Sequence, residues 1–417
     1  EEVDGAEAMA FVRAENERSL AALTGDRRYE SFRQQAEAIL TATDRIPSPS
    51  FLGDGIGNFW QDAGNPKGVW RRTTLESYRS DDTRWETLID IDALARAEGK
   101  DWVWKGADCL APDETRCLIY LSDGGKDAVM VREFDTTTRA FVDGGFVLPE
   151  GKHRIEWLDR DTLLVATDFG LGTLTESGYP YIVKALKRGQ SLAQATEVYR
   201  GDQGDGGYGV SPSVYRDGDG EILAVLIHRP LDTFRSETWR LRDGRPVKLN
   251  VPERVAVQGV MDDRLILSND EGWSFGGRSF KPGSLLAIRL TDLEASAGTD
   301  GAELIFEPGD RQSLQQVAVL ENSFVAAISD NVVGKLVRFV ARDGAWSEQD
   351  IPVPANSDVG LGDRSKKSGR VFVSAQGFLT PMTLSLLEPS TAAPATLRTA
   401  PARFDASTHV VEQFEAT

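Results

Sequence analysis

One stretch of the sequence has the residue spacing of a serine nucleophile. Gly272–Gly277 reads GWSFGG, which satisfies the pattern Gly-x-Ser-x-Gly with Ser274 at its centre. A histidine, His409, follows it, and α/β-hydrolases carry their catalytic groups in the order serine, acid, histidine. Such a serine would attack a carbonyl carbon and form an ester with the acyl group. The acidic residues between the two include Asp310, Asp358 and Asp363.

The residues around Ser274 do not suit that chemistry. A nucleophilic serine needs a sharp turn between a buried strand and a helix, where backbone N–H groups form an oxyanion hole. Leu265–Leu267 could supply the strand, but Pro282-Gly283 follows and cannot continue a helix. Leu285–Ile288 is again strand-like. The sequence therefore predicts that Ser274 lies in a loop between strands and that this chain carries no catalytic residue.

Two further polar stretches resemble binding motifs only superficially. Gly201–Gly209 is rich in glycine, but it lacks the Lys-Ser/Thr pair and the following helix of a phosphate-binding loop. Asp217–Glu221 reads DGDGE, which has acidic oxygens without the spacing of a calcium loop. We predict a connecting loop at the first stretch and a hairpin turn at the second. The nine tryptophans are scattered along the chain and predict packing between structural units.

Composition excludes several classes of partner. The chain has 417 residues and a net charge of 47 − 65 = −18. Nucleic acids and anionic membranes would repel so acidic a protein, so neither is an expected partner. No run of 18 or more apolar residues is present, so no membrane span is expected. The 40% hydrophobic content is enough for a large core.

The two cysteines, Cys109 and Cys117, flank a turn at Pro112. They could lie near each other on neighbouring strands, but a disulfide there would be geometrically awkward. We therefore predict two buried free thiols, which fits a reducing, cytoplasmic location. The two cysteines lack the spacing of a metal site, and the chain has only three histidines that could join them as ligands. No metal or cofactor is therefore expected.

The predicted elements begin with helices and continue as strands. Residues 6–24 and a second segment capped by Asp26 have apolar residues at helical spacing; Gly25 follows the first, and Ile46–Pro49 ends the second. Asp90–Gly99 predicts a short helical connection. Trp102–Val142 reads as four short strands joined by tight turns, which is the size of one propeller blade.

A single four-stranded sheet cannot bury both of its faces, and stacking similar sheets around an axis solves this. The predicted fold is therefore all-β, a seven-bladed propeller of four-stranded antiparallel blades preceded by an arm of two helices. The predicted domains are a helical arm over 1–48, a propeller over 49–402 and a linker strand over 403–417. The predicted blades are 51–95, 102–145, 152–200, 206–250, 255–308, 314–353 and 366–400.

Several segments, in this order and spacing, resemble the N-terminal part of the prolyl oligopeptidase family of serine peptidases. Residues 8–20 resemble the family's opening helix, and residues 58–78 resemble its first blade. Gly106–Phe134 resembles a blade with a strand, an S-P-D-G turn, a strand and an S-x-x-G-x-D motif, here Ser122 to Asp127. Gly377–Pro381 resembles the last blade, and residues 404–417 resemble the strand leading into an α/β-hydrolase domain.

The resemblance implies a propeller that caps a serine hydrolase domain and restricts access to short peptides. The nucleophile, acid and histidine would lie in that domain, beyond this chain, and the domain itself would be a partner. Asp127 matches the last position of the S-x-x-G-x-D motif, where an acidic side chain faces the catalytic domain; the alternative is a solvated turn. Two other functions stay open: a stand-alone scaffold for protein binding, and a propeller enzyme with carboxylates or metal ligands at its channel.

Overall fold

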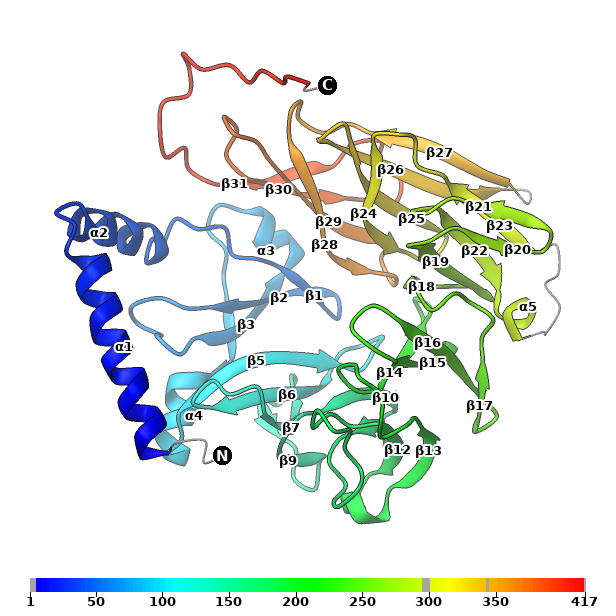
Figure 1. The fold of residues 1–417 in the computed structure, drawn as a ribbon. Helices are drawn as coiled ribbons and strands as arrows, with labels where there is room; N and C mark the ends of the chain where they lie inside the picture. Colours follow the sequence, from blue (N-terminus) through cyan, green and yellow to red (C-terminus); the bar gives the residue numbers. More distant parts are fainter. Residues whose placement is uncertain (1–4, 295–300, 343–344, 416–417) are drawn as a thin grey trace. The chain divides into compact units, whose positions relative to one another are not determined.

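The computed structural model describes residues 5–294, 301–342 and 345–415. They fall into two compact units, one of residues 1–45 with Asp62–Gly64, and one of Ile46–Gln61 with Asn65–Thr417. In the first unit, α1 (Ala6–Thr24) and α2 (Tyr29–Leu40) are the two predicted helices (Figure 1). None of their residues is buried.

Asp26 does not cap α2 as predicted. The N-cap residue is Arg28, and no side chain caps the helix. The Asp26 carboxylate accepts the N–H of this N-cap residue at 2.8 Å instead of an N–H of the first helical turn. On the helix surface, Arg33 pairs with Glu30 and Glu37, one turn to either side. Solvent screens such exposed pairs, so they contribute little to stability.

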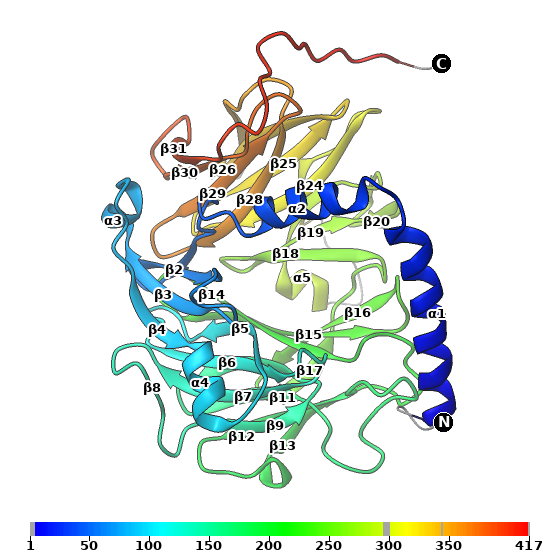
Figure 2. The same cartoon turned by 90° about the vertical axis from the view of Figure 1, so that its left-hand side faces the viewer.

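The second unit is a seven-bladed propeller (Figure 1; Figure 2). From blade 3 round to blade 1, the first strands of successive blades contact one another, which places the first strands on the channel side of the blades. Blade 1 consists of β1 (Ser50–Leu52), β2 (Gly55–Trp60), β3 (Val69–Thr74) and β4 (Glu86–Asp90). Blade 2 consists of β5 (Trp102–Cys109), β6 (Arg116–Asp123), β7 (Val129–Asp135), β8 (Ala140–Phe141) and β9 (Val147–Gly151). Blade 3 consists of β10 (Arg154–Asp159), β11 (Thr162–Ala166), β12 (Ile182–Lys187) and β13 (Thr196–Arg200).

The remaining blades repeat this order. Blade 4 consists of β14 (Ser211–Arg216), β15 (Ile222–Pro230), β16 (Ser236–Arg242) and β17 (Arg245–Lys248). Blade 5 consists of β18 (Val255–Met261), β19 (Arg264–Asn269), β22 (Leu285–Arg289) and β23 (Ala302–Phe306), with a separate hairpin of β20 (Trp273–Phe275) and β21 (Arg278–Phe280). Blade 6 consists of β24 (Gln312–Val319), β25 (Ser323–Asp330), β26 (Val333–Arg342) and β27 (Ala345–Ile351). Blade 7 consists of β28 (Asp358–Ser365), β29 (Arg370–Gln376), β30 (Thr383–Leu387) and β31 (Ala395–Thr399).

Short helices connect some strands. They are α3 (Leu75–Arg79), α4 (Ile91–Glu98), α5 (Leu290–Glu294) and a 3₁₀ turn at Leu192–Gln194. The predicted connection is α4: the Asp90 carboxylate accepts the Ala93 N–H at 2.8 Å, and Gly99 ends the helix in the left-handed conformation. Among the described residues, no helix has both the length and the apolar character that crossing a membrane requires.

Hydrophobic side chains fill the spaces between blades. One core cluster joins Leu226 of blade 4 to Leu265 and Leu286 of blade 5. Tryptophans bridge blades as predicted: the Trp157 indole of blade 3 donates to the Asp108 carbonyl of blade 2 at 3.1 Å. Because both faces of a blade are covered in this way, the central strands are apolar on both sides.

The ring closes between blades 7 and 1 through side chains, since each blade is built from its own consecutive strands. Phe51 and Phe372 stack with ring centroids 4.7 Å apart. The Arg398 guanidinium donates to the Tyr78 and Ser80 carbonyls, joining β31 to the segment around α3. No described strand pairs across this junction, so its stability rests on side-chain contacts, which include these two, the Arg79–Glu388 ion pair and a shared hydrophobic cluster.

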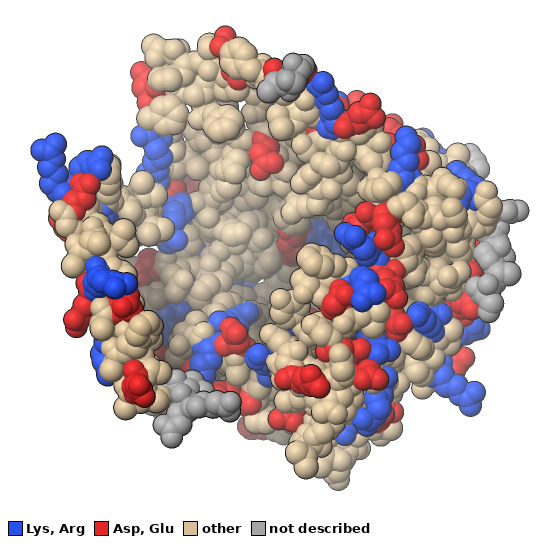
Figure 3. Space-filling view, viewed as in Figure 1, with Lys and Arg blue, Asp and Glu red and all other residues tan. Residues whose placement is uncertain are grey.

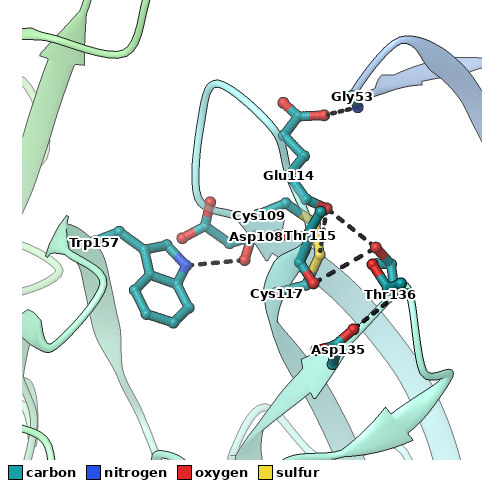
Figure 4. Close-up of a disulfide and its surroundings, with 10 residues drawn as sticks. Gly53, Asp108, Cys109, Glu114, Thr115, Cys117, Asp135, Thr136 and Trp157 are labelled. Atoms are coloured by element: carbon teal, nitrogen blue, oxygen red, sulfur yellow. Dashed lines mark hydrogen bonds between the residues drawn. A yellow bond between two sulfur atoms is a disulfide. The ribbon is translucent and has the colours of Figure 1, made fainter.

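The prediction of two free thiols is wrong. Cys109 and Cys117 form a disulfide between β5 and β6 (Figure 4). The antiparallel register pairs them directly across the ladder, with Cα atoms 3.9 Å apart. Sequence spacing alone did not reveal this register, and the thiol argument for a reducing compartment is lost with it. The cytoplasmic location stays a prediction.

Candidate functional site

In each blade a first turn joins strands one and two, and a second turn joins strands two and three at the opposite end. We call the second-turn end of blades 2–7 the open face. Its turns are residues 124–128, 167–181, 231–235, 270–284, 331–332 and 377–382.

Apolar side chains stand at the tips of four of these turns. Leu171, Phe234, Val332 and Phe378 are each at least 76% exposed. A single exposed apolar residue is ordinary, but recurrence at turn tips on one end of a propeller marks a surface that suits contact with another protein surface. On the view in Figure 3, acidic and basic side chains lie side by side, so no single-sign block dominates that view.

The C-terminal residues lie on the open face at blades 6 and 7. The Gln413 side-chain amide donates to the Asn331 carbonyl at 3.0 Å, and Arg311 forms an ion pair with Glu415. Residues 411–413 line a cavity of about 580 Å³ together with Val332 and Phe378. Residues 403–415 form no strand in the part of the chain described. That they lead to a further domain stays a prediction.

Asp127 lies exposed in the second turn of blade 2, on the open face. The turn is held in place, because the Ser122 hydroxyl donates to the Lys126 carbonyl at 2.7 Å and Lys100 pairs with Asp123 at 2.9 Å. Lys126 pairs with Glu150 at 3.2 Å. Asp127 is therefore presented outward from a fixed turn, and its catalytic-domain role stays a prediction.

Ser274 lies between the blade strands β19 and β22, as the sequence predicts, but in a short strand, β20, rather than in a loop. It belongs to the β20–β21 hairpin, is exposed, and its hydroxyl lies 2.9 Å from that of Ser279. Within the described residues, none of its hydrogen bonds involves a histidine or a carboxylate. Asp363 instead accepts the Phe51 N–H at 2.7 Å, and His409 lies against the Phe404 ring. The structure does not bring these residues together as a triad.

The sequence analysis missed a group of half-buried carboxyls on the inner strands. Burial, with a smaller contribution from the Asp108 carboxylate, raises the pKa of Glu156 to about 8. Burial also raises the pKa of Asp108 to about 6, and its Oδ2 atom has no hydrogen-bond partner. The Arg216 guanidinium opposes both shifts. The three residues come from blades 2, 3 and 4, so no local motif signals them.

This group does not form a metal centre. Among the described residues, no three metal-binding side chains gather around a common point. The raised pKa of Glu156 favours its neutral form, and the Arg216 guanidinium stabilises the ionised form of both carboxyls. A third carboxyl, Glu114, accepts the Gly53 N–H at 2.6 Å, and burial raises its pKa to about 7 (Figure 4). These groups join blades 1 to 4 near the channel.

Comparison with known proteins agrees with this architecture. The sequence model of the family described as prolyl oligopeptidase, N-terminal beta-propeller domain, matches residues 1–399. An uncharacterized peptidase of Sinorhizobium fredii is 40% identical over 422 residues, covering 100% of this chain and 58% of the relative. An uncharacterized peptidase of Rickettsia prowazekii is 26% identical over 438 residues, covering 100% of this chain and 59% of the relative.

The solved structure of a post-proline cleaving enzyme from Rickettsia typhi superposes with a TM-score of 0.89 at 26% identity, covering 99% of this chain and 62% of that one. The chain thus spans less than two thirds of the length of the relatives it matches. With its seven blades, N-terminal helices and a family match over residues 1–399, the chain belongs to the prolyl oligopeptidase family and comprises its N-terminal β-propeller.

Proposed function

We propose that this chain is the propeller of a prolyl oligopeptidase-like serine peptidase, where it covers the active site and admits short peptides. The observation that carries the proposal is the open face. Its exposed apolar tips and the C-terminal residues lie at the same end of the propeller. An α/β-hydrolase domain continuing from this C-terminus would lie next to that face.

In this arrangement the propeller filters substrates by size and supplies no group that breaks a bond. A folded protein would not fit between the open face and the hydrolase domain, whereas a flexible peptide would. The serine ester and the oxyanion hole of acyl transfer would belong to the other domain. The contacts of Ser274 support this division, because its hydroxyl is paired with another hydroxyl.

The test compares this chain with the full-length protein. A fluorophosphonate probe and a short proline-containing fluorogenic peptide are offered to both. We expect labelling and hydrolysis by the full-length protein alone. We also expect the full-length protein to spare the same cleavage sequence when it is displayed in a loop of a folded protein.

Ser274→Ala and Ser279→Ala serve as a matched pair, since each removes one partner of the same hydroxyl contact. Neither variant should change activity. Labelling of this chain that is lost in Ser274→Ala and kept in Ser279→Ala would overturn the division of labour. Equal cleavage of the free and the displayed sequence would overturn the size filter.

A further inference from the structure

First turns of blades that are not neighbours in the ring contact one another. A Cβ on Gly220 of blade 4 would lie 2.5 Å from Pro112 Cδ of blade 2. The Gly218 N–H, also of blade 4, donates to Glu321 of blade 6 at 2.7 Å. Blade 3 separates the first pair around the ring and blade 5 separates the second. Such contacts can form only across the channel.

The first turn of blade 7 makes the longest crossing. The half-buried Lys366 ammonium donates to the Arg216 carbonyl of blade 4 and to the Val260 carbonyl of blade 5, each at 2.8 Å. A Cβ on Gly218 would lie 3.2 Å from the carbonyl oxygen of Lys366 and 3.2 Å from Lys367 Cα. One ammonium therefore bridges the ends of two inner strands on the far side of the ring.

The same turn also reaches the two blades that follow it in the ring. The Lys367 Nζ atom lies 3.0 Å from Asp54 Oδ1 of blade 1 and 4.0 Å from Asp113 Oδ1 of blade 2. Glu114 of that blade 2 turn accepts the Gly53 N–H of blade 1. Backbone also packs on backbone here, because a Cβ on Gly53 would lie 2.9 Å from the Asp113 carbonyl oxygen. We call residues 53–54, 110–115, 217–221 and 366–369, with Glu321, the plug.

Burial and charge stabilise the plug in its closed arrangement. Burial lowers the pKa of Lys366, and the Glu321 carboxylate acts in the opposite direction. A half-buried ammonium loses hydration, and the two carbonyls and the nearby carboxylate replace it. Opening the plug would leave the Arg216 and Val260 carbonyls and the Gly218 N–H without these partners.

We propose that the plug closes the first-turn end of the channel, and that peptides reach the catalytic domain without passing through this end. The inference rests on the proposed function for its second half only. Lys366 is the residue that holds the blade 7 turn across the channel. Substrates then enter on the side of the open face, and the channel behaves as a pocket with one closed end.

The first experiment measures closure without any substrate, by amide hydrogen exchange on the full-length protein. The amides of residues 217–221 and 366–369 should exchange at least about tenfold more slowly than those of the second turn at 124–128. Lys366→Met should abolish that difference. Lys335→Met removes an exposed lysine that pairs with Asp330 at 2.5 Å, and it should leave the plug amides unchanged.

Equal exchange in the plug and at 124–128 of the unmodified protein would overturn closure. So would an unchanged plug in Lys366→Met, because another contact would then hold the turn. Both outcomes are read without enzymatic activity, so the absence of peptidase activity would count against the proposed function and leave this test intact.

The second experiment locks the plug. The double variant Gly218→Cys, Lys367→Cys places two cysteines where the glycine already approaches Lys367 closely, and peptide mapping verifies the new bond. The full-length variant is assayed on a short peptide before and after oxidation, with the unmodified protein treated identically. We expect kcat/KM to stay within about twofold on oxidation, because no substrate passes through a closed plug. A larger loss confined to the locked variant would overturn the proposal.

Discussion

The turns at the two ends of the propeller are packed in opposite ways. At the first-turn end, turns from different blades pack on one another through glycines, carbonyls and paired charges. At the open face, the second turns carry Leu171, Phe234, Val332 and Phe378 outward. One end pairs backbone and charged groups of different blades with one another, while the other leaves apolar surface exposed.

The difference teaches which end can tolerate change. At a close-packed end, adding even one methyl group should lower the free energy of unfolding, because overpacking a side chain destabilises the folded state. An end made of separate tips should be insensitive to substitution in this chain by itself. Its residues should matter only when another surface covers them.

Adding one methyl group at each end is the sharpest way to test this contrast. Gly220 and Gly277 both have left-handed backbone, with φ of 88° and 75°. A Cβ at Gly220 meets Pro112, whereas a Cβ at Gly277, at the tip of the β20–β21 hairpin, meets nothing within 4 Å. Gly220→Ala should lower the free energy of unfolding by about 3 kcal/mol, from backbone strain plus overpacking.

Gly277→Ala is the control and should cost only the backbone strain, about 1 kcal/mol. Urea unfolding followed by tryptophan fluorescence measures both. Equal losses would show that the first-turn end is no more tightly packed than the open face.

The blades were predictable because each has a local signature. Apolar strands such as Ser323–Ala327 and turn residues such as Asp217–Glu221 indicate a blade without reference to the rest of the chain. The structure confirms seven blades, with limits close to those predicted except in blade 7, whose first strand β28 lies wholly before the predicted start at residue 366. In blade 2 it adds β9, which lies beyond the predicted limit at residue 145 and pairs with β7, as β8 does.

The plug and the carboxyl group were not predictable, because both depend on closure of the ring. Lys366 and Arg216 are 150 positions apart, and Asp108 and Glu156 lie on different blades. Nothing in their local sequence distinguishes them from solvated turn or strand residues. The disulfide was not predicted for a simpler reason: a strand register has to be known before cysteines eight positions apart can be paired.

Removing the disulfide should loosen the first-turn end. Cys109 and Cys117 close the turn that carries Pro112 and Glu114 into the plug. Cys109→Ala, Cys117→Ala should lower the free energy of unfolding by about 2.5 kcal/mol, the chain-entropy value for so short a loop. Thiol titration of the unfolded protein, with and without reductant, measures whether the bond is present. Two free thiols without reductant, with unchanged stability in the variant, would contradict the prediction.

The pH dependence of stability should come partly from Glu156. Its pKa is raised from 4.5 to about 8 in the folded protein, so its stabilising contribution is complete below pH 4.5 and is lost as the pH rises through about 8. Glu156→Gln stays neutral, so its melting temperature should fall less than that of the unmodified protein between pH 5 and 9.

Glu197→Gln, an exposed glutamate on the outer strand of the same blade, is the control and should follow the unmodified protein. Melting temperatures across this pH range, taken by differential scanning fluorimetry, decide the matter. Parallel curves for Glu156→Gln and the unmodified protein would mean that Glu156 is ionised throughout.

The smallest expected effect on this chain belongs to Asp127, on the open face. An exposed turn carboxylate contributes little to folding, so Asp127→Asn should change the free energy of unfolding by less than about 0.5 kcal/mol. With the proposed function, the same change in the full-length protein should lower kcat/KM several-fold, and less so at high salt, because a closed cavity screens charge less than bulk water.

The control is Asp143→Asn, which removes an exposed carboxylate beyond the outer strand β8 of the same blade. It should leave both stability and kcat/KM unchanged. A marked loss of stability in Asp127→Asn would make the residue part of its turn, like Ser122. Identical kinetics for the two variants would leave Asp127 as a solvated turn residue, and the open face would then act through its apolar tips alone.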